Sequence, residues 1–166
     1  DFYATPPECT IALLENYQRL FEGSRIWEPA CGDGAISKVL EERNFRVVST
    51  DLHDRGYGDS GMNFLNADCY CGAIITNPPF NLAADFIEKA AATGVPFAML
   101  TKATFWHAKK RQKLFNKTKP MAVIALTWRP AMSPERGKSA TMDFIWTVWG
   151  STPNHTTEYI LQGKDK

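Results

Sequence analysis

The sequence predicts an α/β fold built on a doubly wound, mainly parallel sheet. Two observations support this prediction. Short apolar runs alternate along the chain with segments of helical length, and within each run the apolar residues follow one another with few polar interruptions. Continuous apolar runs are typical of strands that are buried on both faces of a parallel sheet. With 166 residues, 44% of them hydrophobic, residues 1–166 are expected to form a single domain.

Each element follows from its local pattern. A helix is expected over 6–21, where apolar residues recur at helical spacing after prolines that suit a first turn. Apolar runs predict strands over 25–29, 45–50, 72–76, 95–100, 122–128 and 142–149, with a weaker candidate over 62–65. Further helices are expected over 35–42, 81–93 and 108–119. Polar, glycine-containing stretches predict loops over 52–61 and 129–141, and the charged tail from Gln162 is expected to fray.

A glycine turn joins the first predicted strand to the next helix, with the sequence Glu28-Pro29-Ala30-Cys31-Gly32-Asp33-Gly34. Glycine lets the backbone approach a ligand closely, and a helix N-terminus offers unpaired N–H groups. A nicotinamide fingerprint would require glycine where Ser37 stands. Asp51 follows the second predicted strand, where a carboxylate can bind a ribose diol. An ordinary tight turn and a loop-capping Asp51 remain the alternatives.

A second motif, Asn77-Pro78-Pro79-Phe80, directly follows the strand expected over 72–76. The two prolines fix an extended segment whose carbonyls stay free to accept a hydrogen bond from an amine. Asn77 adds a side-chain acceptor, and Phe80 adds an aromatic face on which a planar base can stack. Because ligands bind beyond the carboxyl ends of parallel strands, this position favours a binding site over a plain Pro-Pro turn.

These motifs together resemble a known family. The segments 1–7 and 28–34, Asp51 and the segment 77–80, in that order, are similar to the S-adenosylmethionine (SAM)-dependent amino-methyltransferases. The similarity is strongest to the small bacterial and phage-type DNA adenine-N6 methyltransferases, and it covers about residues 1–100. It implies a Rossmann-like, seven-stranded sheet with an antiparallel late strand, SAM as cofactor, and site-specific methylation of adenine N6. No stretch is long enough for a separate target-recognition domain.

The resemblance also implies roles for individual residues. The family places an Asp-Phe-Leu element before the Asn-Pro-Pro motif, where this chain has Asn63-Phe64-Leu65; Asp68 is a poorer positional match. The residues expected to bind SAM are Tyr3, Thr5, Glu28, Pro29, Ala30, Cys31, Gly32, Asp33, Gly34, Asp51, Leu52, Asn63 and Phe64. The expected catalytic residues are Asn77, Pro78, Pro79 and Phe80. Hydrogen bonds to Asn77 and to the Pro78 carbonyl would prepare the amino group for in-line attack on the SAM methyl, with the target base flipped or single-stranded.

A basic stretch offers a nucleic-acid surface on a chain whose formal net charge is only +1. Salt-dependent phosphate contacts are expected from Lys109, Lys110, Arg111, Lys113 and Arg129. A solvated helix face is the alternative interpretation. Specificity would come from the 129–141 loop, a homodimer or a partner subunit.

The sequence also excludes several kinds of site and location. The four cysteines and three histidines lack the spacing of a zinc site, a disulfide framework or a catalytic triad, so no metal is expected and the thiols are expected to be reduced. No apolar stretch approaches the length of a membrane span. We therefore expect a cytoplasmic protein.

Three other functions fit part of the sequence. The Asn-Pro-Pro-Phe motif also occurs in RNA adenine or guanine amino-methyltransferases, and a tyrosine version occurs in enzymes that methylate a protein glutamine. Phe80 slightly disfavours the glutamine substrate. A non-catalytic SAM-binding partner subunit is a further alternative, which the altered Asn63 leaves open.

Overall fold

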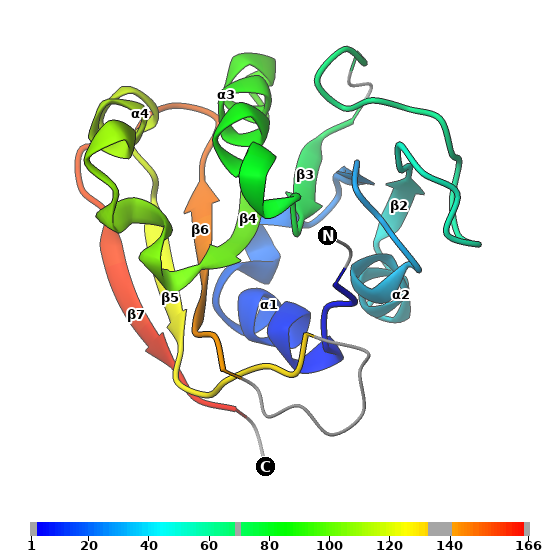
Figure 1. Cartoon of the computed structure of the whole chain (residues 1–166), viewed down its shortest axis with the longest axis horizontal. Helices are drawn as coiled ribbons and strands as arrows, with labels where there is room; N and C mark the ends of the chain where they lie inside the picture. Colours follow the sequence, from blue (N-terminus) through cyan, green and yellow to red (C-terminus); the bar gives the residue numbers. More distant parts are fainter. Residues whose placement is uncertain (1–2, 69–70, 133–140, 165–166) are drawn as a thin grey trace.

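The computed structural model describes residues 3–68, 71–132 and 141–164. In this part of the chain one seven-stranded sheet runs through the molecule in the order β2-β1-β3-β4-β6-β5-β7 (Figure 1). Its strands are β1 (Arg25–Glu28), β2 (Arg46–Ser49), β3 (Ala73–Thr76), β4 (Phe97–Lys102), β5 (Ala122–Leu126), β6 (Phe144–Trp149) and β7 (Glu158–Gln162). Only β6 runs antiparallel to its neighbours, β4 and β5. The mainly parallel sheet with an antiparallel late strand is therefore confirmed.

Helices cover both faces of the sheet. The α-helices are α1 (Pro7–Phe21), α2 (Ala35–Glu42), α3 (Ala83–Thr93) and α4 (Gln112–Thr118), and the 3-10 helices are η1 (Phe80–Leu82), η2 (Ala103–His107) and η3 (Lys109–Arg111). Successive β3 residues face opposite ways: Ile75 packs with α1 and α2, whereas Ile74 packs with α3 and α4. This alternation explains the continuous apolar run, since both faces of the strand are buried.

The 62–65 strand was predicted wrongly. Asn63 Oδ1 accepts a hydrogen bond from the Leu65 amide at 3.0 Å, and the Asn63 carbonyl accepts from Asn66 and Ala67. These local bonds close a turn and leave the segment without a neighbouring strand.

The seventh strand is β7, which no sequence pattern predicted and which ends at Gln162, where the frayed tail was expected to begin. It pairs in parallel with β5 at the sheet edge. Gln162 is tied to α1, because its side chain accepts from Asn16 Nδ2 and donates to Glu15 Oε2, both at 2.7 Å. The expected count of seven strands was right, but β7 forms the seventh strand in place of the 62–65 segment.

Two further expectations need correction. The helix expected over 108–119 is divided into η3 and the short α4, which ends at Lys119 in a left-handed conformation with φ 43°. Cys71 is disulfide-bonded rather than reduced. Cys9 and Cys31 are free, as expected.

Within the described segments, no helix has the length and apolar character needed to cross a membrane.

Candidate active site

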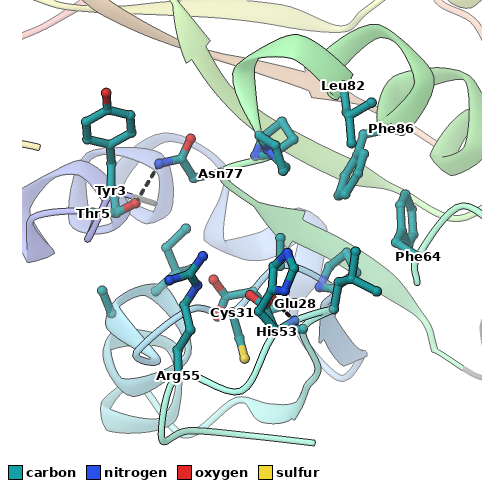
Figure 2. Close-up of a pocket in the computed structure, with 18 of the residues that line it drawn as sticks. Tyr3, Thr5, Glu28, Cys31, His53, Arg55, Phe64, Asn77, Leu82 and Phe86 are labelled. Atoms are coloured by element: carbon teal, nitrogen blue, oxygen red, sulfur yellow. Dashed lines mark hydrogen bonds between the residues drawn. The ribbon is translucent and has the colours of Figure 1, made fainter. Parts of the chain in front are cut away.

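A cavity of about 280 Å³ opens where the chain leaves β1, β2 and β3 (Figure 2). These three strands are parallel neighbours, so their carboxyl ends lie at one edge of the sheet. The segments that leave them bring Glu28, Asp51 and Asn77 to the same cavity wall. The edge that the strand pattern predicted as a binding region is therefore hollow.

Most of the predicted site residues line this cavity. Gly32 and Gly34 are not among the lining residues, but the Gly32 amide donates to Asp51, which does line the cavity. Residues 1–2 of the N-terminal segment lie outside the described part of the chain. The predicted residues that line the cavity are Tyr3, Thr5, Glu28, Pro29, Ala30, Cys31, Asp33, Asp51, Leu52, Asn63, Phe64, Asn77, Pro78, Pro79 and Phe80.

The Asn77 amide is held in one orientation by a residue far away in sequence. Its Nδ2 donates to Thr5 Oγ1 at 3.0 Å, which is the dashed line in Figure 2. Thr5 is itself buried. Asn77 Oδ1 is also buried, and no described residue donates a hydrogen bond to it. A buried acceptor without a donor at a cavity wall is available to accept a hydrogen bond from a ligand.

Phe80 forms the aromatic part of the same wall. The Tyr3 ring stacks on it with a centroid distance of 5.3 Å and an interplanar angle of 21°. Lys102 Nζ lies 4.5 Å from the centre of the Phe80 ring. Phe80 thus offers a planar surface that already attracts both an aromatic ring and a cation.

Carboxylates form the opposite part of the wall. Asp51 accepts hydrogen bonds from the Gly32 amide at 2.9 Å and the His53 amide at 2.8 Å, which fix its orientation. Glu28 is buried and accepts a hydrogen bond from Ser37. Burial raises the pKa of Glu28 well above its ordinary value, against the opposing effect of the Ser37 bond, and nearby Asp33 and Asp51 raise it further. A cationic ligand would relieve this accumulation of acids.

Glycines hold the wall in place at the start of α2. Gly34 has φ +81°, and a Cβ there would lie 2.5 Å from the Tyr57 ring. Tyr57 belongs to the loop after β2, so that loop folds back on the glycine turn. Burial raises the pKa of the neighbouring Cys31 thiol to about 12, which keeps its sulfur protonated and a poor nucleophile.

The far end of the cavity is apolar. Phe64 and Phe86 pack with a centroid distance of 4.7 Å and an interplanar angle of 41°, and Leu82 lies beside them (Figure 2). Asn63 and Phe64 line this end, and Asp68 is not among the lining residues. Asn63 Oδ1 accepts from the Leu65 amide, which leaves its amide NH₂ and a second lone pair of the oxygen for a ligand.

Several wall residues were not predicted from the sequence. Those that come from the loop after β2 and from η1 and α3 are His53, Arg55, Met62, Asn81, Leu82 and Phe86. Adjacency to Asp51 and Phe80 could have pointed to His53 and Asn81. Phe86 could have been found from helical spacing, since it lies one turn after Leu82. Arg55 and Met62 carry no local signal, because only the fold of the loop brings them to the cavity.

The five residues predicted to bind nucleic acid all lie outside the cavity wall. They differ in whether other protein groups already bind their charged ends. Lys109, Lys110 and Lys113 are exposed. Arg111 is bound within the protein: its guanidinium carbon lies 3.9 Å from the centre of the Phe105 ring, and Nη1 donates to the Phe105 carbonyl. Arg129 pairs with Asp143 at 3.0 Å.

Residues 133–140 of the late loop lie outside the described residues. The described part contains no cluster of His, Cys, Asp and Glu suited to a metal ion.

Comparisons with known proteins identify the fold. No protein-family model and no curated protein sequence match the chain. Solved structures do match. A Pyrococcus horikoshii protein described as a candidate RNA methyltransferase superposes with a TM-score of 0.71 at 14% identity, over 92% of this chain and 87% of that one.

Two other solved structures have the same fold. Magnesium protoporphyrin IX methyltransferase from Synechocystis, solved with bound SAM, gives a TM-score of 0.58 at 13% identity, over 87% of this chain and 78% of that one. The modification subunit of a candidate type I restriction enzyme from Vibrio vulnificus gives 0.60 at 14% identity. This chain is matched over 97% of its length but covers only 47% of that subunit. The fold is therefore the Rossmann-like fold of SAM-dependent methyltransferases.

Proposed function

We propose that this protein is a SAM-dependent methyltransferase that acts on an exocyclic amino group, N6 of adenine in DNA. The observation that carries the proposal is the buried Asn77 Oδ1, which lacks a donor at the cavity wall while Thr5 fixes the other end of the amide. An amino group supplies the N–H that this oxygen lacks. The adjacent Phe80 ring suits the planar base to which such an amino group belongs.

The chemistry of the cavity supports SAM as the cofactor. SAM carries a sulfonium and an ammonium group, and Glu28, Asp33 and Asp51 line the cavity with carboxylates. Asp51, whose two oxygens are oriented by backbone amides, would accept the ribose hydroxyls. The apolar end around Phe64 and Phe86 suits the adenine ring. When bound, SAM supplies a methyl group activated by a positively charged sulfur.

The protein's own residues would act by positioning. Asn77 Oδ1 accepts one N–H of the target amino group, and the Pro78 carbonyl accepts the other. These two bonds draw the nitrogen away from planarity, which concentrates its lone pair. Thr5 keeps the Asn77 oxygen pointed at the cavity, and Phe80 holds the plane of the base. No strong base is required, so orientation and electrostatics supply the rate.

The DNA assignment rests on the resemblance of the sequence motifs, and RNA is the second candidate. The Pyrococcus horikoshii protein, described as a candidate RNA methyltransferase, favours an RNA adenine or guanine amino group. The restriction-modification subunit favours DNA. A protein glutamine would use the Asn77 acceptor equally well but would gain less from stacking on Phe80. Either nucleic acid is expected to be met in the cytoplasm, by one domain whose specificity a second copy or a partner subunit completes.

One experiment compares these substrates directly. The protein is incubated with radiolabelled SAM and, in parallel, with unmethylated duplex DNA, single-stranded DNA, total RNA and a protein extract. Label recovered as N6-methyladenine in DNA is the expected result. Label confined to RNA or protein would replace the substrate, and calorimetric SAM binding without transfer to any substrate would favour a non-catalytic subunit.

A substitution at Asn77 tests the catalytic assignment. Asn77→Ala removes the acceptor and is expected to lower methyl transfer by about 100-fold or more, the usual loss for a preorganised transition-state contact. SAM affinity, measured by calorimetry, should change little because the amide faces the target base. Asn116→Ala, an exposed change on α4, is the matched control. An Asn77→Ala enzyme with normal activity would refute the role.

A further inference from the structure

The end of β4 places a cation beside the predicted base-binding motif. Thr76 of β3 pairs with Met99 of β4, and β4 continues for three more residues to Lys102. Lys102 therefore reaches the level of the segment that follows β3, and its Nζ lies 4.5 Å from the centre of the Phe80 ring. Lys102 carries no sequence signal, because nothing in the local pattern links it to residue 80.

The Lys102 ammonium is not engaged by a charged partner in the described part of the chain. Within 3–68, 71–132 and 141–164 it makes neither a hydrogen bond nor an ion pair, and it lies over the Phe80 ring. Asp143 precedes β6, the strand beside β4, and its carbonyl accepts from the Ala103 amide. The Asp143 carboxylate is already paired with Arg129. Lys102 and Phe80 are both half-buried, and a cation–π contact between them is weaker than a charge-assisted hydrogen bond.

We infer that Lys102 binds a backbone phosphate of the target nucleotide, which makes the site selective for a base within a nucleic acid. This inference rests on the proposed function and specifies its substrate class. A base that stacks on Phe80 competes with the ammonium for the ring, and the phosphate of the same nucleotide offers that ammonium a stronger partner. A glutamine side chain or a free base carries no phosphate, so it offers the Lys102 ammonium no anion to bind in place of the Phe80 ring.

The test combines a protein variant with a modified substrate. Methyl transfer is measured on a single-stranded oligonucleotide with one target adenine, and on versions whose 5′ or 3′ phosphate at that adenine is an uncharged methylphosphonate. Lys102→Met keeps the aliphatic stem over Phe80 but removes the charge. We expect kcat/KM on the unmodified strand to fall about tenfold or more, as for loss of a charged hydrogen bond, with SAM affinity unchanged. Lys102→Arg should restore most of the activity.

The modified strands identify the phosphate. One methylphosphonate strand should slow the wild-type enzyme as much as Lys102→Met does, and combining the two changes should cause no further loss. Lys117→Met, on α4 and paired with Glu88, is the matched control and should behave as the wild type. Equal activity of Lys102→Met and the wild type on the unmodified strand would overturn the inference. The inference would also be overturned if, on every methylphosphonate strand, the loss from Lys102→Met added to the loss from the methylphosphonate. Lys102 would then act through Phe80 alone.

A binding measurement separates this inference from the proposed function. Fluorescence anisotropy of the same oligonucleotide, with SAM present, should show weaker binding for Lys102→Met and a salt slope reduced by about 0.7. If this difference is seen but no nucleic acid is methylated, the proposed activity fails and the phosphate contact stands. If nucleic acid is methylated but Lys102→Met binds and reacts normally, the phosphate contact fails alone. Methylation of protein only, with no difference in oligonucleotide binding, overturns both.

Discussion

The Asn77 amide divides its hydrogen-bonding groups between the protein and the cavity. Thr5, 72 residues earlier, accepts from one N–H of Nδ2, and the buried Oδ1 accepts from no described residue. In this arrangement the end of the amide that faces the cavity without a partner is an acceptor, which suits a ligand with an N–H group.

Glu28 links protonation to stability. Burial raises the pKa of Glu28, so the folded protein holds this proton more tightly than the unfolded chain does. Below the ordinary value of 4.5 both states are protonated; as the pH rises above it, the unfolded chain ionises first and the folded state loses stability. That loss continues until the pH reaches the raised pKa of the folded protein.

Glu28→Gln should remove this pH dependence, because an amide of the same shape cannot ionise. We expect the variant to gain stability relative to the wild type as the pH rises above 4.5, measured as the difference in urea unfolding free energy in the absence of SAM. Glu42→Gln, at an exposed position of α2, should show no such trend. A difference for Glu28→Gln that is constant with pH would contradict the linkage.

At the level of elements, the junction of β1 and α2 depends on a contact with the loop after β2. Gly34 adopts φ +81° directly against the Tyr57 ring. Tyr57 in turn donates to Glu41 Oε2 on α2 at 3.1 Å. The glycine is therefore needed both for its conformation and for the space it leaves, and the cavity wall depends on both.

Gly34→Ala tests these two requirements against a matched position. Gly23 has a similar φ of +75°, but a Cβ there would meet nothing within 4 Å. Gly23→Ala should lower stability by the conformational term alone, about 1 kcal/mol. Gly34→Ala should lower it further and weaken SAM binding, because Tyr57 must move. Equal losses of unfolding free energy and unchanged SAM affinity for both variants would show that the ring contact is unimportant.

For the whole molecule, a net charge of +1 conceals an uneven surface. The cavity wall carries carboxylates, which suit a cation, while exposed lysines gather on η3 and α4. Arg111 and Arg129, which the sequence placed in the same basic surface, are engaged by Phe105 and Asp143. Long-range attraction of a polyanion would therefore depend on the three lysines 109, 110 and 113.

Removing these three charges tests the surface as a unit. The triple change of Lys109, Lys110 and Lys113 to Gln should weaken oligonucleotide binding uniformly across sequences and reduce the salt slope by up to about 2–3 if all three contact phosphates. SAM affinity should be unaffected. The same charge is removed elsewhere by changing the exposed Arg19, Arg25 and Arg43 to Gln. Equal effects of the two triple variants would indicate attraction by net charge rather than a defined surface.

The sequence by itself determined the local elements and the motif that ends β3. Helix α2 has the predicted bounds, and α1, β1 and β3 differ from them by a residue at one end, because apolar spacing and glycine or proline boundaries are local properties. Local patterns predicted the wrong structure where strand formation depends on pairing with a neighbouring strand. The 62–65 run forms a turn, whereas β7, with exposed Tyr159 and Leu161, is a strand because β5 offers it an edge.

The tertiary structure alone decided how the site is assembled. The sequence named Thr5, Asp51 and Asn77 separately, but the bond that orients Asn77 and the approach of Lys102 to Phe80 depend on which strand ends meet at one edge of the sheet. Such contacts join residues far apart in the chain, and no local periodicity encodes them. Motifs specify the chemical groups that a site can use, and the sheet order decides which of those groups face one another.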